Sequence, residues 1–171
     1  ALGVLSASRG GIRDCSQRTG ASLGIAHKAL ECPHAGGSVS SFCLLCCACL
    51  FAHAVPSKGI DQKGFSIDAL VGDVKWLGYA SVTLKSDNEP AIVKLLSDAL
   101  KSLRVDGCVE QACEEHPPPY DPQSNGQIEV GVKLVKGQLR TMRSALEAKV
   151  GFKIPVAHPL ISWLVGHSAN V

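Results

Sequence analysis

Two acidic side chains stand at points where the sequence changes its pattern. Asp87 follows the β-rich stretch SVTLKS, and Glu129 opens a helical pattern in NGQIEVGVKLV. Carboxylate oxygens are preferred ligands of Mg²⁺ and Mn²⁺, so two acids from distant segments can share divalent ions if folding brings them together. Such a centre can stabilise the attacking and leaving oxygens of a phosphoryl transfer. Two plainer interpretations remain open: Asp87 as a helix cap, and Glu129 in an ordinary ion pair with Lys133.

A line of cations follows Glu129 at helical spacing. Its members are Lys133, Lys136, Arg140 and Arg143. Residues three and four apart share one helix face, so this pattern predicts a basic stripe that can follow a phosphate backbone. The formal net charge of +2 is too small to indicate nucleic-acid binding by itself, so the prediction depends on clustering. The alternative is the ordinary solvent-exposed side of an amphipathic helix.

The elements that must position these side chains follow from hydrophobic spacing. The chain of 171 residues is 46% hydrophobic, enough for one domain with a buried core. Apolar periodicity predicts helices over residues 65–79, 90–103, 127–146 and 155–169, with Ser66 as the cap of the first. Strands are predicted at 81–85 and 109–116, and PPPYDPQSNG must be a loop because of its prolines. This alternation predicts an α/β or α+β domain.

The first part of the chain has a different character. Residues 1 to about 40 are rich in Gly, Ser and Ala and show no sustained period, so we expect a poorly ordered or foreign extension. The following apolar run of roughly 14 residues is shorter than the ~20 that span hydrocarbon, which favours a buried strand. A single membrane span over residues 39–55 is the alternative. Trp76 and Trp163 are expected to fill the core.

The cysteines and histidines of this first part permit a zinc interpretation that their spacing disfavours. Six of the eight cysteines lie in the first fifty residues, and no secretory leader pattern precedes them, so we expect reduced thiols. Four residues occur in the order of a zinc finger: His27, His34, Cys43 and Cys46. The interval between the second histidine and the first of these cysteines is short for such a finger, and both cysteines belong to an apolar run.

The segments LKSDNEPAI and PYDPQSNGQIE together resemble the catalytic core of retroviral and retrotransposon integrases, in the RNase H-like superfamily. The residues in the family's order and spacing are Tyr120, Pro122, Gln123, Ser124, Asn125, Gly126 and Glu129. The resemblance implies an RNase H-like fold, a mixed sheet flanked by helices. Asp87 and Glu129 would be the second and third acids of a catalytic D,D,E triad and ligands of Mg²⁺ or Mn²⁺.

Further roles are implied by the same resemblance. Lys133 and Lys136 match helix positions that contact DNA, while Tyr120, Gln123 and Asn125 match a loop beside the target strand. The family trims DNA ends and joins them to target DNA by metal-dependent strand transfer. The implied partners are therefore element ends, target DNA and further copies of the chain, and the implied compartment is the nucleus.

The first acid of the triad is not evident. The family places it on a strand some tens of residues before the second, yet between residues 15 and 63 the only acids are Glu31 and Asp61. Asp14 is flanked by glycine and arginine and is a poor candidate. We therefore expect an extension over residues 1–42 and an integrase-core-like domain over 43–171, incomplete at its first strand, in a degenerate or truncated copy with impaired catalysis. The alternative is a non-enzymatic remnant that binds nucleic acid or oligomerises.

Overall fold

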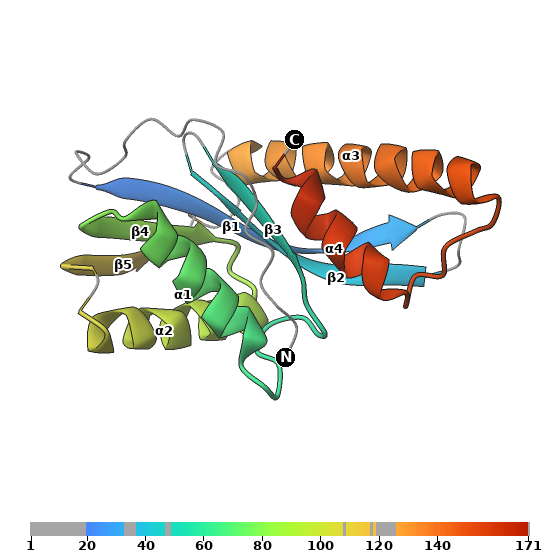
Figure 1. Ribbon diagram of the computed structural model, residues 1–171. Helices are drawn as coiled ribbons and strands as arrows, with labels where there is room; N and C mark the ends of the chain where they lie inside the picture. Colours follow the sequence, from blue (N-terminus) through green and yellow to red (C-terminus); the bar gives the residue numbers. More distant parts are fainter. Residues whose placement is uncertain are drawn as a thin grey trace.

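The computed structural model describes residues 20–32, 37–46, 49–107, 109–116, 118 and 126–170. The strands within these ranges are β1 (Ala21–Cys32), β2 (Gly37–Leu45), β3 (Leu50–Ala54), β4 (Ser81–Ser86) and β5 (Gln111–Glu115). The helices are α1 (Phe65–Leu77), α2 (Pro90–Val105), α3 (Gly126–Val150) and α4 (Pro159–Ser168). Strands and helices are arranged as one sheet flanked by helices (Figure 1).

The sheet has the order β3-β2-β1-β4-β5, with the longest strand at its centre. β1, β2 and β3 form an antiparallel meander, whereas β4 lies parallel to β1 and β5 lies parallel to β4. Residues 21–25 of β1 lie beside residues 82–86 of β4, and Ile25 is the partner of Ser86. This mixed sheet with flanking helices is an α/β fold of RNase H-like topology, as expected from the sequence.

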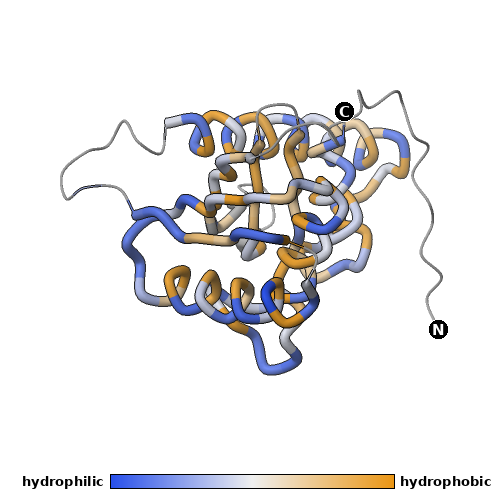
Figure 2. Tube along the Cα trace, turned by 90° about the vertical axis from the view of Figure 1, so that its left-hand side faces the viewer, coloured by the Kyte–Doolittle hydropathy of each residue, from blue (hydrophilic) through white to orange (hydrophobic). Residues whose placement is uncertain are grey.

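Two hydrophobic clusters cover the two faces of the sheet, because successive strand side chains point to opposite faces. Leu23 and Ile25 of β1 belong to the cluster formed with α1 and α2, while Ala26 belongs to the cluster formed with α3 and α4. Hydrophilic and hydrophobic residues follow one another around the turns of the helices in Figure 2, as in amphipathic helices. Even-numbered positions 22–28 of β1 therefore face α3.

α1 begins where Asp61 satisfies the free amide groups of its first turn. The Asp61 carboxylate accepts hydrogen bonds from the backbone N–H of Ser66 at 2.8 Å, Phe65 at 3.1 Å and Lys63 at 3.2 Å. The bond from Ser66 is the largest of the effects that hold the pKa of Asp61 below its usual value. Ser66 was the predicted cap, and that prediction is wrong: Ser66 is buried within the helix, and Gly64 occupies the cap position with φ of 72°.

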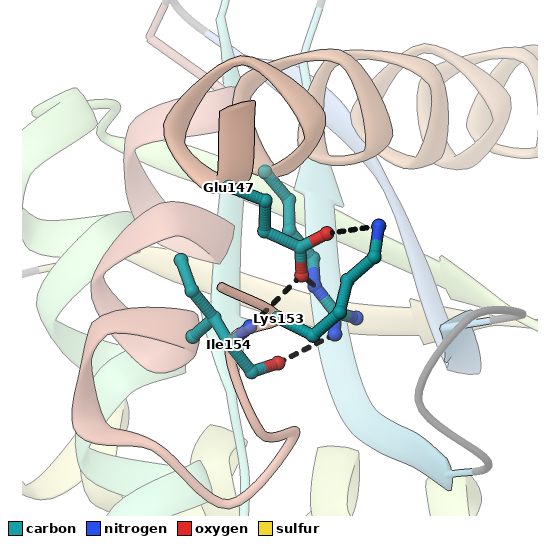
Figure 3. A network of polar contacts seen from close by, with 4 residues as sticks. Glu147, Lys153 and Ile154 are labelled. Carbon is teal, nitrogen blue, oxygen red and sulfur yellow. Dashed lines mark hydrogen bonds and ion pairs between the residues drawn. The ribbon is translucent and has the colours of Figure 1, made fainter. Parts of the chain in front are cut away.

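α3 is amphipathic at its start and then buries charge near its end. Ile128, Val132, Val135 and Leu139 are buried along one stripe, as predicted, and Arg143 and Glu147 continue that stripe. Figure 3 shows the resulting network, in which Arg143 Nε donates to Glu147 Oε1 at 2.9 Å and Lys153 Nζ donates to Glu147 Oε2 at 2.8 Å. The backbone of Ile154 closes it, accepting from Arg143 at 2.6 Å and donating to Glu147 at 3.0 Å. The network ties the chain after α3 back onto that helix.

The expected boundary at residue 42 is wrong for the described residues before it. Residues 21–32 form the central strand, and residues 37–45 form its neighbour, so the first strand is present. β1 was concealed by its low apolar content, whereas much of β2 belongs to the apolar run for which a buried strand was expected. Residues 1–19 lie outside the described ranges.

The apolar run over residues 39–55 also differs from a membrane span. Its described residues form the adjacent antiparallel strands β2 and β3. No helix in the described ranges is long and apolar enough to cross a membrane.

The two tryptophans were expected to fill the core, but Trp76 and Trp163 are each 55% exposed. Trp76 contacts Phe51 edge to face, and Trp163 stacks on His167.

Candidate functional site

Asp87 lies where β4 ends beside the central strand. It directly follows Ser86, the partner of Ile25, and its Oδ2 is 4.0 Å from Nζ of Lys28 in β1. Both side chains are a little under half exposed, at 43% for Asp87 and 44% for Lys28. The cap position of α2 is held by Glu89, so the interpretation of Asp87 as a helix cap is wrong.

Glu129 is exposed in the first turn of α3, and its neighbour Ile128 anchors that turn on β1. The close contact is with Gly24: a Cβ added to this glycine would lie 3.2 Å from Cβ of Ile128. Gly24 precedes Ile25, the residue beside the end of β4. The structure therefore brings Asp87 and Glu129 to the same end of the sheet, on either side of residues 24–28 of β1.

The basic stripe of α3 is shorter than its spacing predicts. Lys133 and Arg140 are exposed, whereas Lys136 is half-buried and its charge acts on the buried thiol of Cys43. Arg143 is only 7% exposed and is bound by Glu147 and Ile154. Its predicted place in a nucleic-acid surface is therefore corrected: Arg143 follows Leu139 by four residues and falls on the buried stripe.

The three loop residues predicted to contact DNA, Tyr120, Gln123 and Asn125, lie outside the described residues, and their roles stay predictions. The other acids considered for the missing first ligand are elsewhere. Asp61 accepts hydrogen bonds from amide groups in the first turn of α1. Glu31 lies in β1 beyond Ile25, where the pairing with β4 ends, and Asp14 is outside the described ranges.

The site can be tested against the divalent metal that the sequence resemblance implies. The β1 residues that face α3 are Ser22, Gly24, Ala26 and Lys28, none of which carries a carboxylate. Across the part of the chain that the structure describes, no three His, Cys, Asp or Glu side chains gather as a possible metal site. The one charged β1 side chain beside Asp87 is an ammonium group, which opposes a metal cation. A lysine beside Asp87, with no carboxylate among these four β1 residues, does not fit a two-metal centre.

Sequence reasoning missed both β1 residues that define this site. Gly24 and Lys28 lie in the segment assigned to an extension, where the alternation of Leu23 and Ile25 was the only strand signal. Two apolar residues are too few to establish a period of two. The parallel pairing with β4 could only be found by folding the chain.

The thiols do not converge on a zinc site. Cys43 packs in the cluster with α3 and α4, whereas Cys46 packs in the cluster on the opposite face of the sheet. Burial raises the pKa of the Cys43 thiol to about 12, so it stays protonated and is a poor metal ligand. His34 lies outside the described residues.

Comparisons with known proteins agree with the fold. No protein-family model matches the sequence, and no curated protein matches it. A solved structure does: a chain in the cryo-EM structure of the simian T-cell lymphotropic virus intasome in complex with PP2A regulatory subunit B56 gamma has a TM-score of 0.58 and 18% identity. The match covers 81% of this chain and 46% of that chain, so this chain spans less than half of the matched protein. At this identity the likeness establishes the fold.

Proposed function

We propose that this chain is a retrotransposon integrase-like domain that binds DNA and is impaired in strand transfer. The observation that carries the proposal is the arrangement around Gly24 of β1: Asp87 follows the β4 residue paired with Ile25, and Glu129 follows Ile128, which packs against Gly24. The fold, shared with a chain of a retroviral intasome, supports the family assignment. DNA ends, target DNA, a second copy of the chain and the nucleus are the partners and compartment that this assignment implies.

The chain's own residues suit phosphate contacts. Lys133 and Arg140 are exposed on α3 and Lys136 is half-buried between them, and such a line of cations contacts phosphates by charge rather than by base sequence. The first turn of α3 adds the positive end of a helix dipole near Glu129. Binding of this kind is sensitive to salt and tolerant of sequence. Position 24 offers no carboxylate, so charge developing on a reacting phosphate is left without one of its usual counterparts.

Salt-dependent DNA binding tests the proposal. Fluorescence anisotropy with a labelled duplex should give an affinity that falls linearly with the logarithm of salt concentration. The double variant Lys133→Ala/Arg140→Ala should reduce that slope by about 2, because each removed phosphate contact contributes roughly 0.9. The matched control Lys94→Ala/Lys101→Ala removes two exposed cations from α2, on the opposite face of the sheet, and should keep the slope of the unmodified chain. Equal slopes for the two variants would remove α3 from the interface.

Strand transfer with Mn²⁺ tests the impairment. We expect joining of a labelled donor end to plasmid DNA at the level of the protein-free reaction. Robust joining that depends on Asp87 would overturn the impairment while leaving DNA binding in place. Absence of both joining and DNA binding would instead contradict the family proposal as a whole.

A further inference from the structure

The face of β1 beside Asp87 carries a lysine and no carboxylate among residues 22, 24, 26 and 28. A side chain at position 24 would point at Ile128, which immediately precedes Glu129, and Asp87 follows the β4 residue paired with Ile25. Position 24 therefore lies beside the first turn of α3 and one residue before the last β1 residue paired with β4. The residue there is glycine, and Lys28, four residues along the same face, reaches Asp87 instead.

We infer that Lys28 supplies beside Asp87, as a tethered ammonium group, the positive charge that a divalent ion would bring, and that this site does not assemble a metal centre. The inference deepens the proposed function by making its DNA binding independent of metal. The metal measurements below need no DNA, so they stand or fall separately from that proposal.

The charges near Asp87 determine how much the removal of Lys28 should change the affinity for Mn²⁺. Lys85 faces the same side of the sheet as Gly24 but is paired with Glu115 at 2.9 Å in β5. Lys28 Nζ lies 4.0 Å from Asp87 Oδ2 on this face. Because Lys28 and Asp87 are both partly exposed, water and salt screen the ammonium, and its removal should have a moderate effect on metal affinity. Adding a third carboxylate should increase the metal affinity more than removing the lysine does, because a carboxylate adds a ligand as well as a negative charge.

Manganese titration by calorimetry and by the electron paramagnetic resonance signal of free Mn²⁺ measures this directly. The full chain should bind Mn²⁺ with a Kd of about 1 mM or weaker, the range of sites poor in charged ligands. Lys28→Gln, which keeps length and polarity, should bind roughly threefold to tenfold more tightly, as expected for one partly screened charge. Adding Gly24→Asp to Lys28→Gln should gain at least about a further tenfold. Lys101→Gln, an exposed lysine on α2, is the control and should leave Mn²⁺ affinity unchanged.

The aspartate substitution needs a packing control, because its Cβ would stand 3.2 Å from Cβ of Ile128. Ile128→Ala in the same chain removes the two γ carbons that lie 3.8 and 3.9 Å from that point and gives the helix room to shift. Gly24→Ala adds the Cβ without the carboxylate and should not tighten Mn²⁺ binding. If the aspartate variants fail to fold, Lys28→Gln decides alone.

Two results of the Mn²⁺ titration would overturn the inference. One is tight Mn²⁺ binding by the unmodified chain, well below millimolar Kd, that Asp87→Asn abolishes. The other is a folded Lys28→Gln variant whose Mn²⁺ affinity equals that of the unmodified chain. DNA affinity that is unchanged by a chelator supports the inference, whereas chelator-sensitive binding contradicts it. Lack of any DNA binding would end the proposed function and leave the Mn²⁺ result standing.

Discussion

Replacement of Arg143 by methionine distinguishes two roles of the cations on α3, contact with DNA and stabilisation of the fold. Arg143 is buried and donates to Glu147 Oε1 at 2.9 Å and to the carbonyl oxygen of Ile154 at 2.6 Å. Methionine keeps much of the length and loses both bonds. The carboxylate then retains Lys153 and the Ile154 amide but has lost its buried partner. Removing one member of a buried ion pair destabilises by about 3–5 kcal/mol.

The expected change is large enough to measure by calorimetry or by thermal circular dichroism. In a domain of this size each kcal/mol lowers Tm by roughly 2–4 °C, so Arg143→Met should lower it by roughly 6–20 °C. Arg140→Met is the matched control, since Arg140 is exposed three residues earlier on the same helix. It should change stability by no more than about 0.5 kcal/mol and should reduce the salt slope of DNA binding by about 1.

The two variants should therefore show opposite effects. Arg143→Met, measured below its own Tm, should keep the salt slope of the unmodified chain. If Arg143→Met left Tm unchanged and weakened DNA binding as Arg140→Met does, Arg143 would point outward, and the orientation of the last turns of α3 would be wrong.

Other predictions follow from ionisation and burial. The network holds the pKa of Glu147 at about 2, chiefly through the hydrogen bond from Lys153, so its stabilising effect is complete above the ordinary glutamate pKa near 4.5 and is lost as pH falls towards 2. Glu147→Gln should be less stable than the unmodified chain at pH 7, and urea denaturation should show the difference shrinking below pH 4.5. Iodoacetamide at pH 8 should alkylate exposed Cys113 and spare Cys43, whose pKa is raised to about 12 by burial, as read by peptide mass mapping. Asp61→Ala should lower Tm more than Asp68→Ala, because the Asp61 carboxylate accepts hydrogen bonds from the backbone N–H groups of Phe65 and Ser66 at the start of α1.

The parts of the fold predicted from sequence are those with dense, local signals. α2 begins at Pro90, and its predicted stripe of Ile92, Leu96, Ala99 and Leu103 is buried. A helix repeats its pattern over several turns, so a few substitutions do not hide it. β4 and β5 were also predicted at nearly the observed bounds, because turn residues flank each of them.

The central strand was missed because its stability comes from its neighbours. Residues 24–32 of β1 pair with β2 and residues 21–25 pair with β4, and these backbone hydrogen bonds form whatever the side chains are. Only three of its residues, Leu23, Ile25 and Ala26, are buried apolar groups among those whose side chains are described. Tertiary pairing of this kind leaves little trace in a local hydrophobic pattern.

The candidate site was predicted in part for a similar reason. Asp87 and Glu129 were found because each stands at the junction of two strong patterns. Gly24 and Lys28 were not found, since their importance lies in the register of β1 against β4 and in the contact with Ile128. Arg143 was assigned to the wrong surface, because spacing of three and four residues fits two adjacent stripes of a helix equally well.

Glycine at position 24 contributes to the packing of the fold without supplying a side chain for chemistry. In a central strand glycine usually weakens packing, yet here it lets Ile128 of α3 approach the sheet closely. An acid in its place would have to displace that contact or be accommodated by a shift of the helix. The clusters on both faces of the sheet do not depend on a carboxylate at this point. The fold therefore does not require a carboxylate at position 24, and the fold alone cannot establish that the chain joins DNA.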